Sequence, residues 1–399
     1  MKIGLISEAL PYLPSRGGFR LYGGNLIRCL SKRHQIDLIS LLRDDDEQHL
    51  DWPKQYCASV TAIPADGVGV GSRLTNFVSS TLWGKPLNHR SELGAILQDG
   101  VQSGKWDVLH IEGAFTGGLV PEDLPIAKVL SLHDSWTLRC DEMLKCAQSV
   151  KEKLYYRMLK YQEPRYERLV YPRFERCVVV AGPDVEAVKK TVPEARVALI
   201  PYGTDTDYFH PVPVTKQPFT MVFHSHLGYA PNIEAALEFA NDVFPLIRRE
   251  IPEAVFHLVG AKPVEKITDL ASRPGIKISA DLPDLREAVC SAQLYVCAIR
   301  HGTGLKSKML EAMGMRLPIV CYPGSTVGIE VEHGKQVLVA QNPEEFARYV
   351  LELLRDPGKA ETMAKAGRQL VEEQYSWDSR ARMFEDLYRQ VIEERKKRS

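Results

Sequence analysis

The stretch from residue 294 to residue 322, LYVCAIRHGTGLKSKMLEAMGMRLPIVCY, holds the residues best suited to binding an anion. An apolar strand is expected to end near Ile299 and a helix to begin near Leu305–Ser307, with a glycine-containing loop between them. The first N–H groups of a helix have no partner inside the helix, so they attract negative charge. Three cations within nine residues add to this attraction: Arg300, Lys306 and Lys308. The combination predicts a phosphate or diphosphate site, whereas the glycines alone would indicate only an ordinary turn.

The loop and the helix that follows it supply further candidates. Gly302 and Gly304 can adopt conformations that let backbone amides approach a ligand closely, and we assign Thr303 and Leu305 in the same loop to the site. Glu311 lies one turn beyond the last of the cations, so the two can share a helix face. A carboxylate at that distance can accept hydrogen bonds from the diol of a ribose.

A second glycine-containing turn, PSRGGFR, follows the first predicted strand and precedes a helix. Gly17 and Gly18 would let the chain pass close to a phosphate or to a second substrate, and Arg20 would supply a cation. A tight strand-to-helix connection with a solvated arginine explains the same pattern equally well.

Two other predicted strands end in polar residues. His133 and Asp134 close the strand in LSLHDSWTLRC, where an imidazole can hydrogen-bond a substrate. A structural histidine that is paired with Asp134 is the alternative. Glu112, after another strand, is a further candidate for contacting the second substrate, although for Glu112 and its neighbour His110 a purely structural role is favoured.

These segments must be positioned by strands and helices that alternate along the chain. Seven short apolar runs before residue 200 and six after residue 218 suit strands covered on both faces of a parallel sheet. Amphipathic stretches between them predict doubly wound α/β domains. The proline-rich segment 200–218 interrupts the pattern and predicts a boundary between a first domain, 1–200, and a second, 201–377. Ligands of such sheets bind at the carboxyl ends of the strands, so two such domains imply a cleft and an enzyme that joins two substrates.

Composition excludes several classes of protein. The 399 residues include 51 Lys+Arg and 51 Asp+Glu, so the basic excess of a protein that grips nucleic acid is missing. The eight cysteines form no C-x-x-C pair and no zinc-binding spacing, which favours free thiols in a reducing compartment. With neither a secretory signal nor a membrane span in the sequence, we expect a cytoplasmic protein.

One segment suggests contact with a membrane. Residues 151–176 hold eight Lys/Arg against four Glu, with five tyrosines. This pattern fits a basic, aromatic helix at the inner face of an anionic membrane or near a lipid-linked substrate. A long helix whose tyrosines pack on the sheet is the simpler interpretation, and the oligomeric state is not predicted.

The segment GTGLKSKMLEAMGMRLPIVCYPGSTVGIE resembles the donor-binding signature of family 4 glycosyltransferases. Their GT-B fold has two tandem Rossmann-like domains with a cleft between them. KIGLISEALPYLPSRGG is similar to the first strand and glycine loop of the family, and IPYGTDTDYFHP to its interdomain linker. YSWD precedes a final helix, 378–399, that resembles the segment crossing back to the first domain. The resemblance covers almost the whole chain.

The resemblance implies transfer of a sugar, with retention of configuration, from a UDP- or GDP-linked sugar to a hydroxyl acceptor. The acceptor could be a glycan, a lipid-linked sugar or a small molecule, and no metal or other cofactor is implied. The donor would bind the second domain and the acceptor the first. Glu311 matches the second Glu of the family's E-x7-E motif, which holds the ribose. Without a metal, fixed groups must stabilise the departing diphosphate, and the candidates are Arg300, Lys306, Lys308 and Gly304.

Three departures from the family pattern leave alternatives open. Thr303 stands where the first Glu of the motif is expected, the loop HSHLGYAPN lacks Arg and Lys, and Ser225 replaces an expected glycine. We expect the nucleobase near Gly260 and the segment Ala280–Leu285, which includes Leu282. A nucleotide-sugar epimerase and an inactive relative that serves as a binding or scaffold subunit are the alternative functions.

Overall fold

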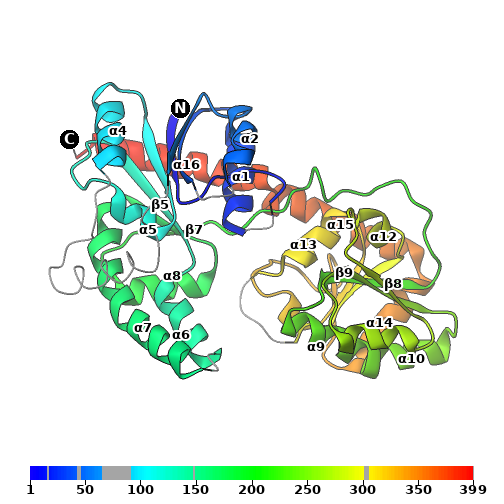
Figure 1. Ribbon diagram of the computed structural model, residues 1–399. Helices are drawn as coiled ribbons and strands as arrows, with labels where there is room; N and C mark the ends of the chain where they lie inside the picture. The colour runs from blue at the N-terminus through cyan, green and yellow to red at the C-terminus, as the bar shows by residue number, and fades with distance from the viewer. Residues whose placement is uncertain (16–17, 43–45, 65–90, 147–148, 301–304, 399) are drawn as a thin grey trace. The chain divides into compact units, whose positions relative to one another are not determined.

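The computed structural model describes residues 1–398 except 16–17, 43–45, 65–90, 147–148 and 301–304 (Figure 1). The chain divides into two compact units. The N-terminal unit comprises Met1–Tyr202 and Arg380–Ser399, and the C-terminal unit comprises Gly203–Ser379. Each division lies two residues from the position that the sequence predicts. The buried apolar residues form two separate cores, one inside each unit.

The N-terminal unit is built on a seven-stranded parallel sheet in the order β3-β2-β1-β4-β5-β6-β7. All seven apolar runs predicted before residue 200 are strands of this sheet. They are β1 Lys2–Ser7, β2 Gln35–Leu42, β3 Ser59–Pro64, β4 Val108–Glu112, β5 Ala127–His133, β6 Arg176–Val179 and β7 Val197–Leu199.

Helices lie against this sheet, and their described members alternate with the strands along the chain. They are α1 Gly18–Leu30, α2 Asp51–Lys54, α4 Ser91–Gln102, α5 Ala114–Leu119, α6 Trp136–Cys146, α7 Val150–Val170 and α8 Gly182–Thr191. The last helix of the chain, α16 (Trp377–Lys396), joins this unit from Arg380 onward. It is tied there by ion pairs from Arg33 to Glu385 and from Arg176 to Glu394, each with a nitrogen–oxygen distance of 2.6 Å.

The C-terminal unit repeats the plan with six parallel strands in the order β10-β9-β8-β11-β12-β13. The strands are β8 Thr220–His226, β9 Val255–Ala261, β10 Ile276–Ala280, β11 Leu294–Cys297, β12 Ile319–Cys321 and β13 Leu338–Val339. Its helices are α9 Ala230–Glu238, α10 Phe244–Glu250, α11 Glu265–Thr268, α12 Arg286–Cys290, α13 Ser307–Gly314, α14 Pro343–Arg355 and α15 Pro357–Leu370.

One predicted helix is divided. The amphipathic stretch 232–250 predicts a single helix, but a π-helical turn at Phe239–Val243 separates α9 from α10. Pro245 has no N–H to donate and stands in the first turn of α10, where a helix tolerates it.

The strand order locates the candidate site in each unit. In both sheets the connections reverse direction between two neighbouring central strands, β1 and β4 in one and β8 and β11 in the other. Ligands of doubly wound sheets bind beyond the carboxyl ends of the strands at this switch point. Glu112 ends β4 and Arg300 follows β11, so the predicted residues lie at these edges.

Candidate functional site

The start of α13 is the predicted anion site. Lys306 occupies the N-cap position in an extended conformation, and its side chain makes no capping hydrogen bond. Burial lowers the pKa of Lys306, and the nearby charge of Lys308 lowers it further. Two half-buried cations therefore stand beside a helix N-terminus, where a bound anion would offset their mutual repulsion.

Glu311 lies one turn further along α13, with 21% of its side chain exposed. One carboxylate oxygen is 2.8 Å from His224 Nε2, on β8. Burial raises the pKa of Glu311, but His224, together with Ser307 and Lys308, outweighs burial and places the pKa below its ordinary value. Since a carboxylate has about four acceptor positions, the bond to His224 leaves Glu311 able to accept from a diol. His224 is a site residue that the sequence does not predict, because nothing in the local sequence connects it to Glu311.

Arg300 is engaged elsewhere. Its guanidinium forms an ion pair with Glu238 at the end of α9 and lies 3.8 Å from the centre of the Tyr322 ring. A longer contact of 3.4 Å reaches the carbonyl of Gln341. Lys306 and Lys308 therefore remain the candidate cations for the diphosphate in this conformation.

The turn after β12 supports the loop that enters the site. Ser325 Oγ donates hydrogen bonds to the carbonyls of Cys297 and Ile299, at 2.8 and 3.2 Å. A side chain at Gly324 would come closer than 3.0 Å to the carbonyl of Arg300. Leu305 packs against the core of the C-terminal unit. Gly302, Thr303 and Gly304 lie outside the described residues.

Ser225 and Gly260 face each other across β8 and β9. A Cβ atom on Gly260 would come closer than 3.0 Å to the Ser225 carbonyl oxygen, so only glycine fits there. The Ser225 hydroxyl is buried and has no hydrogen-bond partner among the described atoms. Leu282, after β10, is 40% exposed.

The glycine turn of the N-terminal unit is partly described. Gly17 lies outside the described residues, and Gly18 is the first residue of α1, with open space where a Cβ would stand. Arg20 is not a solvated cation, since its guanidinium is 2.6 Å from the buried carboxylate of Asp46. The Tyr12 ring centre lies 5.7 Å from the same guanidinium.

His133 is hydrogen-bonded to a carboxylate, but this carboxylate is not that of Asp134, the partner expected if the histidine were structural. Its Nε2 is 2.8 Å from the Glu112 carboxylate, whereas Asp134 contacts Arg139 at 3.4 Å. The pairing with Asp134 is therefore wrong. A bulge in the pairing of β5 with β6 and a positive φ of 66° place His133 out of the regular strand. This turns the imidazole toward β4 rather than toward its sequence neighbour.

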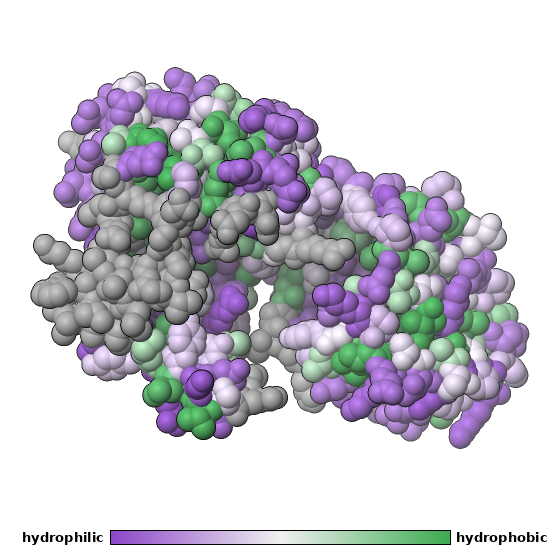
Figure 2. Space-filling view, viewed as in Figure 1, coloured by the Kyte–Doolittle hydropathy of each residue, from purple (hydrophilic) through white to green (hydrophobic). Residues whose placement is uncertain are grey.

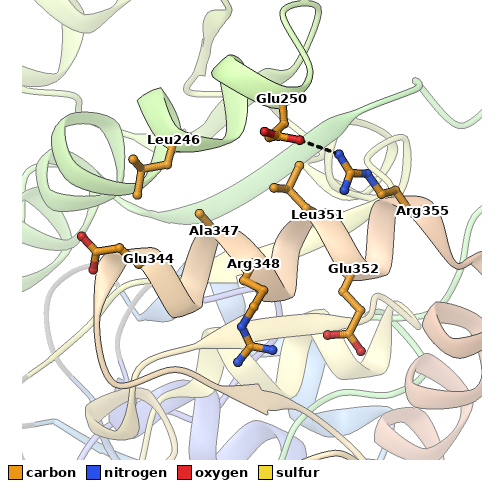
Figure 3. Close-up of a pocket in the computed structure, with 8 residues that line it drawn as sticks. All are labelled: Leu246, Glu250, Glu344, Ala347, Arg348, Leu351, Glu352 and Arg355. Carbon is orange, nitrogen blue, oxygen red and sulfur yellow. Dashed lines mark hydrogen bonds and ion pairs between the residues drawn. The ribbon is translucent and has the colours of Figure 1, made fainter.

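A surface groove between α10 and α14 is separate from these residues (Figure 3). An ion pair between Glu250 and Arg355, at 2.9 Å, crosses it above the apolar side chains of Leu246 and Leu351. None of the predicted site residues lines it.

The described residues offer neither a metal centre nor a membrane-spanning helix. No group of three or more His, Cys, Asp or Glu side chains is arranged to hold a metal ion there. None of the described helices combines the length and the apolar character needed to cross a bilayer. All seven cysteines whose side chains are described are free thiols.

Two family models match the chain, and each covers mainly one of the two units. The family model described as Glycosyltransferase Family 4 matches residues 16–208, and the model described as Glycosyl transferases group 1 matches residues 218–356.

Two relatives in sequence differ in how much of the chain they share. A GDP-mannose-dependent alpha-(1-6)-phosphatidylinositol monomannoside mannosyltransferase of Mycobacterium tuberculosis is 26% identical over 220 residues, which cover 49% of this chain and 57% of that protein. The chain thus matches little more than half the length of that relative. An uncharacterized 44.6 kDa protein in the cps region of Klebsiella pneumoniae is 20% identical over 404 residues, covering 98% of this chain and 99% of that one.

Solved structures resemble the whole chain. Anabaena Alr3699/HepE in complex with UDP aligns with a TM-score of 0.62 at 14% identity, over 97% of this chain and 99% of that one. Sucrose-phosphate synthase from Thermosynechococcus elongatus aligns with a TM-score of 0.59 at 16% identity, over 98% and 99%. At this identity the likeness concerns the fold, which agrees with the two parallel sheets described above. The predicted resemblance is confirmed: the chain belongs to the family 4 glycosyltransferases and has their GT-B fold.

Proposed function

We propose that the protein transfers a sugar from a nucleotide diphosphate sugar to a hydroxyl acceptor, with retention of configuration. The single observation that carries the proposal is the start of α13, where Lys306 and Lys308 adjoin a helix N-terminus and Glu311 follows one turn later. These groups match the two charged or polar parts of a nucleoside diphosphate, namely the diphosphate and the ribose.

The proposed chemistry needs no metal and no cofactor besides the donor. The bond between the anomeric carbon and the diphosphate oxygen breaks, and a bond to the acceptor oxygen forms on the same face of the sugar. The departing phosphate oxygen takes the proton of the acceptor hydroxyl. Negative charge grows on the diphosphate during this step, so Lys306, Lys308 and the amides of α13 stabilise the transition state more than the ground state.

In this proposal the N-terminal unit holds the acceptor. His133 and Glu112 lie at the carboxyl ends of β5 and β4, beside the switch point of that sheet. The imidazole of His133 would hydrogen-bond a sugar or acceptor hydroxyl and so orient it, without taking its proton.

The donor is proposed to be a UDP- or GDP-linked hexose. The Mycobacterium relative is named for GDP-mannose, and the Anabaena structure contains UDP. Both names support a nucleotide sugar and leave the base to be decided by experiment. The test is calorimetric titration with UDP and GDP, followed by mass spectrometry of the protein incubated with a panel of nucleotide sugars and candidate acceptors. Failure to bind either nucleotide would overturn the proposal.

One observation favours a second candidate, a nucleotide-binding subunit without transferase activity. The guanidinium of Arg300 contacts Glu238 and the ring of Tyr322, so in this conformation it is already engaged within the protein and does not point to a diphosphate role. Binding of a nucleotide without turnover of any donor, including hydrolysis or epimerisation, would select this candidate.

We also propose that the start of α7 rests on an anionic membrane surface. Val150 and Leu154 are 83% and 69% exposed, and Figure 2 shows apolar side chains gathered at the tip of the α6–α7 hairpin, in the lower left of the view. Lys151, Lys153 and Arg157 are exposed on the same turns. Glu152, the acidic residue among them, is engaged in a capping box with Ser149. Exposed apolar and basic side chains on one helix end suit a surface of anionic lipid.

A further inference from the structure

A group of buried and half-buried polar side chains lies around β4 of the N-terminal sheet and reaches the carboxyl end of that strand. It links Tyr388, His110, Glu112, His133 and Tyr202. Glu112 stands at its centre, with one carboxylate oxygen 2.8 Å from His133 Nε2 and the other 2.8 Å from His110 Nε2. Buried carboxylates are costly unless they are paired, so two histidine partners on one carboxylate call for an explanation.

The protonation state of Glu112 follows from its surroundings. Burial by itself raises the pKa of Glu112, but the nearby ring of His110 and the hydrogen bond from His133 outweigh burial and lower it to about 2. Glu112 is therefore a carboxylate at neutral pH. An ionised carboxylate only accepts hydrogen bonds, so the Nε2 atom of His133 must carry a proton.

This fixes what the other ring nitrogen of His133 can do. With the proton on Nε2, Nδ1 of the neutral ring has a lone pair and accepts. Nδ1 is 3.3 Å from the Tyr202 hydroxyl, and this contact is partly exposed, whereas the bond to Glu112 is fully buried. Because Glu112 occupies Nε2, a substrate hydroxyl would bond to Nδ1 in place of the Tyr202 hydroxyl. The rings of Phe19 and Tyr22, with centres 4.7 and 4.5 Å from that of His133, hold the imidazole in place.

Tyr202 and Tyr388, the two outer members of this group, belong to segments that continue into the C-terminal unit. Tyr202 is the last residue of the N-terminal unit before Gly203 begins the other. Tyr388 belongs to α16, and its hydroxyl is hydrogen-bonded to His110 Nδ1. The Phe384 ring, one turn earlier on α16, stacks on His110 with a centre distance of 5.0 Å. Both segments that join the units therefore support the histidine pair.

We propose that Glu112 is a positioning residue, which holds His133 so that Nδ1 accepts a hydrogen bond from a sugar hydroxyl of the substrate. This inference rests on the proposed function, because it assumes that the substrate reaches the carboxyl edge of the N-terminal sheet. Glu112 acts through His133 and contacts no substrate itself.

The first test does not depend on activity. In the wild-type protein with ¹⁵N-labelled histidine, long-range ¹H–¹⁵N NMR at neutral pH reports which ring nitrogen of His133 carries a proton, with His133→Ala giving the assignment. We expect a proton on Nε2 and none on Nδ1. A proton on Nδ1, in a neutral or a charged ring, would overturn the inference even if the protein proves to be an active transferase.

The second test is a double-mutant cycle. His133→Ala is expected to lower kcat/KM on the order of 100-fold and Glu112→Gln about tenfold, with a double variant no worse than His133→Ala alone. Multiplied effects, on the order of 1,000-fold in the double variant, would show that Glu112 does not act through His133. Glu167→Gln is the matched control, because Glu167 is buried in the same unit but bonded to the backbone of Thr137.

Nucleotide titration separates this inference from the proposed function. UDP and GDP affinities, carried by the C-terminal unit, should be unchanged in His133→Ala, in Glu112→Gln, in the double variant and in the control. A wild-type protein that binds no nucleotide would contradict the proposed function, and the NMR result would still decide whether Glu112 fixes the tautomer of His133.

Discussion

Glu112 and Glu167 are buried in the same unit, yet their neighbours move their pKa values in opposite directions. Two histidines outweigh burial at Glu112 and lower its pKa from 4.5 to about 2. At Glu167 burial dominates, and the hydrogen bond from the Thr137 backbone only moderates it, so its pKa is raised to about 6. Burial alone therefore does not decide the charge of a carboxyl group. The partners that the fold brings to it do.

The two carboxyl groups should give opposite pH dependences of stability. The folded-state pKa of Glu112 is depressed, so its contribution is present above pH 4.5 and is lost as the pH falls toward 2. The shift of about 2.5 units corresponds to about 3 kcal/mol. The folded-state pKa of Glu167 is raised, so its contribution is present below pH 4.5 and is lost as the pH rises through 6, a change of about 2 kcal/mol.

Urea unfolding at a series of pH values measures both effects. The free energy of unfolding of the wild type, minus that of Glu112→Gln, should fall as the solution is acidified. The same difference for Glu167→Gln should fall as the solution is made neutral. Equal slopes for the two variants would contradict the assigned protonation states.

Lys306 and Glu311 should both be needed for turnover, but for different physical reasons. Lys306→Ala removes a cation that opposes the charge of the departing diphosphate, and Glu311→Ala removes the acceptor for the ribose. Each should lower kcat/KM by 10²-fold or more, on the order of 3 kcal/mol. Steady-state kinetics, with the donor that the panel of nucleotide sugars selects, measures this effect.

Lys335→Ala is the matched control for these variants. Lys335 is an exposed lysine of the same unit that contacts only the exposed Glu332 among the described residues, and its replacement should leave the rate unchanged. Wild-type rates in Lys306→Ala and Glu311→Ala would contradict the assignment of the site to α13.

At the scale of elements, the pairing of β8 with β9 depends on one glycine. Gly260→Ala would push a methyl group into the Ser225 carbonyl, which belongs to the backbone and cannot rotate away. We expect a loss of about 3 kcal/mol in the stability of the C-terminal unit, at the upper end for overpacked sites. Thermal unfolding monitored by circular dichroism measures it. Gly358→Ala, at the start of α15, should change the stability little, because a Cβ there would meet only the Asp356 carboxylate, at an ordinary contact distance of 3.4 Å.

The exposed start of α7 makes a separate prediction. Leu154→Glu replaces an exposed apolar side chain with an anion among basic neighbours, so it should reduce binding to anionic vesicles at least tenfold. Co-sedimentation with vesicles of phosphatidylcholine containing 30% phosphatidylglycerol, a composition of about one-third anionic lipid, measures the binding, which should also weaken in high salt.

Met383→Glu is the control for that variant, since Met383 is an exposed apolar residue on α16 of the same unit. Equal binding by Leu154→Glu and the wild type would contradict a lipid contact through α7. A concentration-dependent dimer that Leu154→Glu abolishes would show instead that a second copy covers this surface.

At the scale of the whole molecule, the two separate cores imply that a nucleotide stabilises one unit directly. UDP or GDP at 100 times its dissociation constant should stabilise the C-terminal unit by about 2.7 kcal/mol. Hydrogen exchange should show new protection at β8, at α13 and at the turn after β12, all within Gly203–Ser379. Protection confined to the N-terminal unit would contradict the assignment of the donor to the C-terminal unit.

The sequence determined the two parallel α/β sheets. A strand buried on both faces must be apolar along its whole length, and a covering helix must be amphipathic. Each kind of element can therefore be recognised from a short stretch of residues, and so can their alternation along the chain. All thirteen predicted strands, including the six of the C-terminal unit, are present for that reason. The family signature around Lys306 and Glu311 is likewise a local pattern of residues.

Only the tertiary structure decided which charges meet. His224 lies 87 residues from Glu311, Arg300 lies 62 from Glu238, and His133 lies 21 from Glu112. Each pair is brought together by strand order and by the positions of strand ends, which depend on packing between distant segments. Local sequence therefore suggested Asp134 as the partner of His133 and gave no sign of Glu238 beside Arg300, because the residues next to a side chain do not reveal a partner that the fold brings from a distant segment.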